Sequence, residues 1–517
     1  MTRTRQTVIT ACTLLLALCA LTTAQGASDC NERRGPSDKN FCKNQCLTSE
    51  PFENDTCLRY DPCCDENEYT GMTHFSPRPQ GSNAVRKLMG GGRTANITLS
   101  YSKTFGHEAL GRWYAPLCDN TITFGPEGGA DTDVRAVEFG LPADFQSTIC
   151  LRPSISTTLI DLDAWFELDR WVSGMWAYVA IPFVHTNWHW DANEVIANGG
   201  NTGTLSSPVY RSIKEAWCGD KPFGDAPALH CAKACYGRKK ENHCAGIRLD
   251  VGYDAWRSAC GHVGVGVTTV AGIGTHGTST NLFQPVIGTG RSWQLGVTMN
   301  ASQVLWEAYD EYLLTIHLDA TATHLFGHCQ QRVLGLKDNG PWSHYLLLKK
   351  FDAQGNYVSL ERAANILCQN LHIKADIMAD IGVILTYHHC DTTFSLGGGF
   401  WGRSGEDLSG SCPTIAENTY GIKGDQPTGD RTTASTTTIK QAGPEDAAPV
   451  YLRNADLSTA HALHPRSIAG TFFASCERHW DEWCWHPYAG IGGSVEFPLG
   501  NTALKQWSIM LKGGVTL

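Results

Sequence analysis

The chain has 517 residues, of which only 18% are charged, and a formal net charge of −10. This charge makes nucleic acid an unfavourable partner, and no stretch after the N-terminal leader reaches the ~18 continuous apolar residues that a membrane helix needs. Low charge together with 53 glycines and 16 tryptophans is typical of an exported all-β protein.

The N-terminus has the pattern of a secretory signal peptide. Arg3 and Arg5 precede an apolar run from Ala11 to Leu21, and small residues follow around Ala24. We therefore assign residues 1–26 as a leader and exclude them from the fold. It contains Cys12 and Cys19, so 19 of the 21 cysteines remain afterwards. In an exported protein these favour disulfides, and their odd number leaves a free thiol or an intermolecular bridge.

Residues 27–92 form a cysteine-rich segment with few apolar residues. Without a core, such a segment depends on disulfides for its stability, and six cysteines allow about fifteen pairings. A zinc module is the alternative, but no pair of CxxC knuckles is present, so we expect no metal. The candidate disulfide cysteines are Cys30, Cys42, Cys46, Cys57, Cys63 and Cys64.

From residue 93 to 517 an alternation of period two predicts β-strands. In the clearest run, Ile373 to Tyr387, the apolar side chains share one face and Lys374, Asp376 and Asp380 share the other. This run is longer than the usual five or six residues of a strand in a soluble protein. Similar runs, some weaker, are 97–105, 134–139, 160–168, 175–190, 247–253, 263–271, 293–299, 314–322, 394–400, 471–476, 488–497 and 507–517.

These runs predict an all-β fold, a closed antiparallel transmembrane β-barrel of roughly 12 to 16 strands. The run Trp507–Leu517 would be its closing strand. A soluble β-sandwich also alternates, but aromatic residues near strand ends, such as Tyr101, Trp293 and Tyr387, favour the interfacial girdles of a barrel. In the run from Ile160 to Leu168, Trp165 falls on the polar face and is the exception.

Three segments of residues 93–517 do not alternate. Residues 191–245 predict a long outer loop whose candidate disulfide cysteines are Cys218, Cys231, Cys235 and Cys244. Residues 327–371 have helical propensity around several leucines, and predict a short helical insertion that narrows the lumen or covers one end. Residues 403–465 are polar, include the threonine-rich run Thr432–Thr438, and predict a mobile loop.

The charged residues on the polar faces are the candidate functional residues, because charged side chains that line a pore set its ion preference. Acids outnumber bases among them, which favours cations, although pairing across the lumen would merely rigidify the barrel. No phosphate loop, nucleophile elbow or zinc-protease helix occurs, so we expect neither enzymatic activity nor a cofactor. The candidates for the lumen are Arg248, Asp250, Asp254, His317, Asp319, Lys374, Asp376 and Asp380.

Taken together, these features resemble bacterial outer-membrane β-barrels of the porin-like kind. More loosely, a barrel rich in cysteine and tryptophan looks like the major outer-membrane proteins of intracellular bacteria, and the segments Asn339–Ser343 and Val383–Cys390 look similar to barrels from other intracellular bacterial lineages. One departure is Leu517, where such barrels usually end in Phe or Trp. The resemblance implies a diffusion channel or an envelope protein cross-linked by disulfides.

We therefore expect a channel in the bacterial outer membrane that lets small polar solutes or ions pass, with outer-membrane lipid as its surroundings. Disulfide-linked envelope proteins or further copies of the chain are its expected protein partners. One alternative is a plugged structural or adhesive surface barrel, and another is a secreted soluble β-rich binding protein.

Overall fold

The computed structural model describes residues 84, 87, 95–115, 120–200, 209–308, 312–410, 412–426, 429–480, 482–501 and 503–515. The predicted leader, the six cysteines from Cys30 to Cys64 and the terminal Leu517 lie outside the described residues.

Twelve antiparallel strands form a closed barrel. Each strand pairs with its neighbours along the chain, and the first and last strands pair with each other from Ala95 opposite Val515 to Thr104 opposite Gln506. The closing strand predicted at the C-terminus is thereby confirmed. The strands are β1 (Ala95–Thr104), β5 (Ser154–Glu167), β6 (Met175–Trp190), β9 (Ile247–Ser258), β10 (Gly261–Ala271), β11 (Gln294–Ala308), β12 (Tyr312–Val333), β16 (Cys368–His389), β17 (Thr392–Arg403), β21 (Ser467–His479), β22 (Pro487–Asn501) and β23 (Gln506–Val515).

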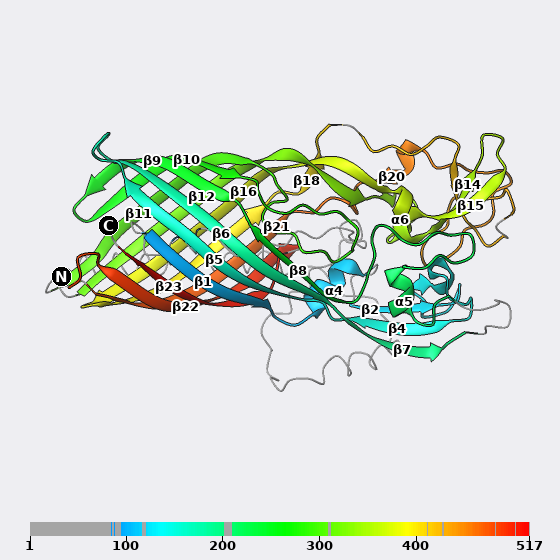
Figure 1. The fold of residues 1–517 in the computed structure, drawn as a ribbon, viewed down its shortest axis with the longest axis horizontal. Helices are drawn as coiled ribbons and strands as arrows, with labels where there is room; N and C mark the ends of the chain where they lie inside the picture. Colours follow the sequence, from blue (N-terminus) through cyan, green and yellow to red (C-terminus); the bar gives the residue numbers. More distant parts are fainter. Residues whose placement is uncertain are drawn as a thin grey trace, which may run out of the picture.

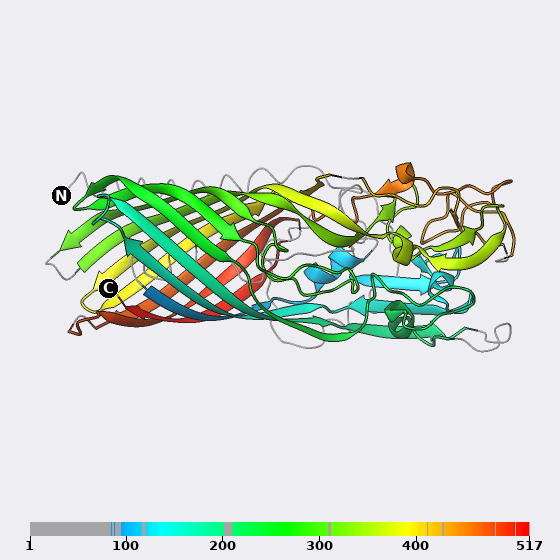
Figure 2. The ribbon, with the colours of Figure 1, turned by 45° about the horizontal axis from the view of Figure 1, so that its top comes forward.

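The two ends of the barrel differ in their connections (Figures 1 and 2). At one end, which we call the short-turn rim, brief turns join β5 to β6, β9 to β10, β11 to β12, β16 to β17 and β21 to β22. At the opposite end the long connections fold together into a second body, which we call the head.

The head contains small sheets and short helices built from different connections. Strand β4 (Gln146–Leu151) pairs with β7 (Ala192–Asn198), and β14 (Leu347–Phe351) pairs with β19 (Tyr420–Ile422), so segments distant in sequence share a sheet. Two short strands extend the barrel sheet into it, β8 (Gly237–Cys244) on β6 and β18 (Glu406–Leu408) on β16. The other elements are β2 (Thr121–Gly125), β3 (Val134–Arg135), β13 (Gly335–Leu336), β15 (Tyr357–Arg362), β20 (Leu457–Ser458), α4 (Glu108–Tyr114), α5 (Ile213–Cys218), α6 (Ala363–Ile366), η1 (Ala136–Phe139), η3 (Ser343–Tyr345) and η4 (Asn454–Asp456).

An aromatic core holds the head together. Trp217 and Trp342 lie 4.8 Å apart between ring centroids, and Tyr114 contacts Phe283 at 5.5 Å. These four residues come from four different connections, and all are at most 1% exposed. Burial of this much aromatic surface is a large stabilising term, which explains why long connections form a packed body instead of separate loops.

Three expectations differ from the head that is observed. The α-helix expected within residues 327–371 is limited to Ala363–Ile366, because Leu347, Leu348 and Leu360 lie in the paired strands β14 and β15, where all three are buried. The run Val134–Phe139 forms β3 and η1 in the head and no barrel strand. Residues 403–465 pack into the head, where Thr433 and Thr437 are fully buried. Among the described residues, no helix is long and apolar enough to span a membrane.

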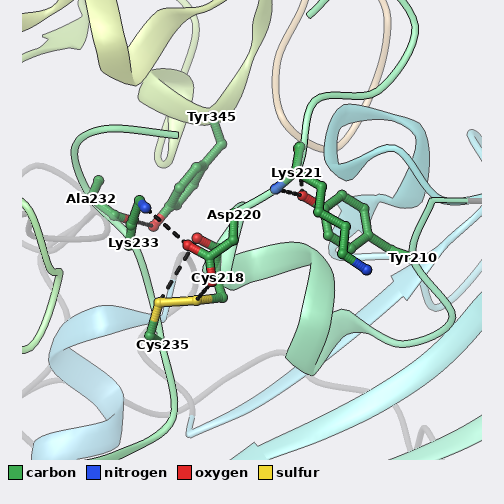
Figure 3. Close-up of a disulfide and its surroundings, with 8 residues drawn as sticks. All are labelled: Tyr210, Cys218, Asp220, Lys221, Ala232, Lys233, Cys235 and Tyr345. Atoms are coloured by element: carbon green, nitrogen blue, oxygen red, sulfur yellow. Dashed lines mark hydrogen bonds and ion pairs between the residues drawn. A yellow bond between two sulfur atoms is a disulfide. The ribbon is translucent and has the colours of Figure 1, made fainter. Parts of the chain in front are cut away.

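Disulfides fasten the connection between β6 and β9. Cys218 bonds to Cys235, and Tyr345 from another connection donates a hydrogen bond of 2.7 Å to the carbonyl of Ala232 beside it (Figure 3). Cys231 bonds to Cys368 at the start of β16, a partner that spacing did not reveal. Cys244, expected to be bridged, is free, and it lies at the end of β8.

Candidate lumen site

The barrel has apolar side chains on the outside and polar ones inside. On β23, Ile509 and Leu511 are 51% and 53% exposed, whereas Met510 and Lys512, which alternate with them, are 4% and 5% exposed. A closed sheet satisfies every backbone hydrogen bond without water, and an apolar outer belt matches lipid. Exposed aromatics near the short-turn rim, Trp171, Trp256 and Trp306, belong where such a belt meets the headgroups. The chain is therefore an outer-membrane β-barrel protein.

The inward face is rich in carboxylates. Two bases of the strands, Arg248 and Lys512, are buried inside the barrel, and Lys512 pairs with Glu477. Arg332 and Arg403 are also buried but pair with Glu406 at the head. The buried acids on the strands are Asp161, Asp250, Asp254, Asp319, Asp380, Glu477 and Glu496. Within the part of the chain that the structure describes, negative side chains thus dominate the inward face.

Six of the eight residues predicted for the lumen point inward. Arg248 donates two hydrogen bonds of 2.8 Å to Asp250 and one of 3.0 Å to Thr321. His317 contacts Thr386 at 3.2 Å across β12 and β16. Arg248, Asp250, Asp254, Asp319 and Asp380 are all buried, and His317 is partly buried.

Lys374 and Asp376 are placed on the outside, contrary to expectation. They pair with each other at 2.9 Å, and the side chain of Asp376 is 58% exposed. The reason is a β-bulge: the register between β12 and β16 shifts next to these residues, and the backbone N–H groups of both Asp376 and Ile377 donate to the hydroxyl of Ser404. An extra residue in one strand reverses which face the following side chains occupy.

A group of aromatic side chains also faces inward, and the pattern of β5 and β6 did not single it out. Trp165 stacks on Trp176 at 4.4 Å and lies 6.1 Å from Tyr178. Gly252 makes room for this group, because a Cβ there would lie 2.2 Å from the ring of Trp176. The available signal was Trp165, the one large apolar residue on the acidic face of its strand.

A lysine from before the first strand lies inside the barrel. The ammonium of Lys87 is 2.5 Å from Asp319 Oδ2 and 3.9 Å from Asp250 Oδ2. It also lies 4.9 Å from the ring centroid of Tyr178 and 5.3 Å from that of Trp165. The carboxylates Asp250 and Asp319 and the rings of Trp165, Trp176 and Tyr178 together form what we call the ammonium cage.

A cavity of about 160 Å³ adjoins the ammonium cage. His262 contacts Asn300 at 2.9 Å and Ser302 at 2.6 Å. The Nδ1 atom of His388 lies within hydrogen-bond distance, 2.7 Å, of the hydroxyl of Thr393. The cavity is lined by polar and imidazole groups that include His262, Asn300, His317, Thr386, His388, Thr393, Glu477 and His479. It offers a space beside the cage that is large enough for a few non-hydrogen atoms, with polar groups set among mostly carbon surface.

No family model and no curated protein matches the sequence. Solved structures with a similar fold include an outer-membrane channel from Pseudomonas putida F1, at 9% identity and a TM-score of 0.34, covering 82% of this chain and 96% of that one. A Pseudomonas aeruginosa FadL homologue aligns at 10% identity and a TM-score of 0.29, covering 86% and 96%. The transport unit of the autotransporter AIDA-I from Escherichia coli aligns at 6% identity and a TM-score of 0.29, covering 86% and 100%.

Proposed function

We propose that this chain is an outer-membrane channel through which small polar solutes or ions diffuse, with a preference for cations. The observation that supports the proposal is the excess of buried carboxylates over bases on the inward face of the strands. Side chains of one sign along a narrow, low-dielectric passage attract the opposite ion and repel the like one. Diffusion through such a passage needs no chemical step and no cofactor.

The test is the reversal potential of the full chain, reconstituted in a planar bilayer across a potassium chloride gradient. We expect a potential of the sign that shows cation preference. Asp380→Asn removes an inward charge and should reduce this preference. Asp376→Asn removes an acid from the same strand that lies 58% exposed on the outside, so it is the matched control and should leave the potential unchanged. A preference for anions in the unsubstituted protein would contradict the proposal.

A second candidate function is a plugged envelope barrel that is linked to other proteins by disulfides, as the loose resemblance to cysteine-rich major outer-membrane proteins also implies. The observation in its favour is that Cys260, Cys390 and Cys484 are free, exposed and all located in turns of the short-turn rim. Thiols gathered at one rim are suited to intermolecular bridges. Disulfide cross-links would be detected by running the protein from intact cells on a gel without reductant. Bands of high mass that disappear on reduction, together with no measurable conductance, would favour this function over the channel.

A further inference from the structure

The contacts of Lys87 are those of a bound cation. Its side chain is 6% exposed, two carboxylates lie within 3.9 Å of the ammonium, and the rings of Tyr178, Trp165 and Trp176 lie 4.9 to 5.9 Å from it. Aromatic faces attract an ammonium through their quadrupole, most strongly when it is desolvated. The combination of ion pair and aromatic walls is specific for a compact positive charge.

The barrel strands build this cage without help from Lys87. Asp250 is held by Arg248 and by a hydrogen bond of 2.6 Å from Thr268, so its charge is already balanced. The stacking of Trp165 on Trp176 and the space at Gly252 position the rings. All of these contacts join residues of β5, β6, β9 and β10, which pair with one another in the barrel wall.

Asp319 is the member of the cage that depends on a cation. It is 1% exposed, and among the described residues Lys87 forms its ion pair, while the guanidinium of Arg248 acts on it from beyond ion-pair distance. Among the described residues none donates a hydrogen bond to its Oδ1. A buried carboxylate without a compensating partner is costly, so this site requires a positive group, and the chain supplies one from outside the barrel strands.

We propose that the ammonium cage is a binding site for primary alkylammonium solutes, and that Lys87 is the occupant that the chain itself provides. The inference rests on the proposed channel, since it names the class of solute that the lumen selects. The ammonium of the solute would replace that of Lys87 between Asp319 and the rings, and the adjoining cavity of about 160 Å³ would accept the rest of a small molecule. A lysine side chain is itself an alkylammonium, which is why its geometry reports what the site accepts.

The test removes Lys87 and offers the missing group as a free molecule. The full chain carrying Lys87→Ala is purified in detergent and titrated with butylammonium by calorimetry. We expect saturable binding at least tenfold tighter than in the unsubstituted protein, where Lys87 competes. Lys87→Met, which keeps the bulk of the side chain without the charge, should bind more weakly than the alanine variant. Butanol and butyrate, which lack the ammonium, should not bind.

Two further variants assign the binding to the cage. In the Lys87→Ala background, Asp319→Asn should reduce butylammonium binding at least tenfold, whereas the exposed control Asp376→Asn should not change it. Equal binding of butanol and butylammonium by Lys87→Ala, or no binding of butylammonium by that variant, would overturn the inference. Because calorimetry does not depend on conductance, a barrel that binds butylammonium but conducts no ions contradicts the proposed channel and leaves the cage intact.

Discussion

The barrel and the head of this protein place the same kinds of side chain on opposite sides. In the barrel Val267 is 56% exposed while Asp250 is fully buried, and in the head Trp342 is 1% exposed while the charged side chains lie mainly at the surface. The reason is the solvent: lipid surrounds the barrel strands, and water surrounds the head. One chain therefore follows two rules of burial, and the rule changes where the strands leave the membrane.

The bulge on β16 marks one place where the rule changes. On the head side of it, Ile373 and Ala375 are 1% and 4% exposed, and on the barrel side Ile377 is 58% exposed. All three have odd numbers and would share a face in a regular strand. One inserted residue thus allows one part of a single strand to pack its apolar side chains in the head core while the other part turns them towards lipid.

The largest effect that tests the contrast between head and barrel is expected in the head core. Trp342→Ala removes a fully packed ring and the hydrogen bond of 2.7 Å that its indole donates to the carbonyl of Tyr114, and should cost about 3 to 5 kcal/mol of head stability. Hydrogen–deuterium exchange should rise across the head, while the barrel keeps its heat-modifiable migration on a gel. Trp483→Ala, at 66% exposure in a turn of the short-turn rim, is the control. Loss of the barrel together with the head would show that the two regions form one cooperative unit.

A smaller effect tests the solvent directly, with two valines of matched exposure. Val267 on β10 is 56% exposed and Val358 on β15 is 54% exposed. Val267→Arg should cost about 2 to 4 kcal/mol, because it moves a charge into lipid, whereas Val358→Arg should change stability by less than about 0.5 kcal/mol. Folding equilibria of the two variants in lipid vesicles measure this difference. Equal costs would mean that β10 does not face the hydrocarbon.

A third effect is a pH dependence confined to the head. Burial lowers the pKa of His461 to about 4 and that of His464 to about 3, and holds the pKa of His344 well below its usual range. These side chains stay neutral when folded, but the unfolded chain takes up protons below its ordinary histidine pKa of about 6.5. Head stability should therefore fall as the pH drops below about 6.5, by on the order of 1 kcal/mol per pH unit for each histidine.

Glu406 adds a second loss at lower pH. Burial alone would raise its pKa, but Arg332 and Arg403 outweigh burial and hold the pKa at about 2. Its stabilising contribution is present above the unfolded pKa of about 4.3 and is lost as the pH falls from there towards 2. Hydrogen–deuterium exchange at pH 7.5, 5.5 and 4, corrected for intrinsic rates, should show protection lost first in the head. Parallel loss in the barrel strands would contradict this assignment.

Much of the barrel could be predicted because successive side chains of a strand point to opposite faces. The resulting alternation of apolar and polar residues is visible in the sequence. The run at 247–253 and the described part of the run at 507–517 form β9 and β23 with the expected faces. The candidate site was predicted only in part. Asp250, Asp254 and Asp319 point inward as the alternation implies, but the bulge that turns Lys374 and Asp376 outward has no signal in a period-two pattern.

The sequence by itself determined the two-faced strands, and with them the class of fold and its membrane surroundings, because period and polarity are local properties. Only the tertiary structure decided which distant groups meet. It joined connections from four places into one aromatic core, and it paired Cys231 with Cys368. It also placed Lys87 beside Asp319, 232 positions away along the chain. Such contacts depend on barrel closure and on how the long connections pack, which no local pattern of residues records.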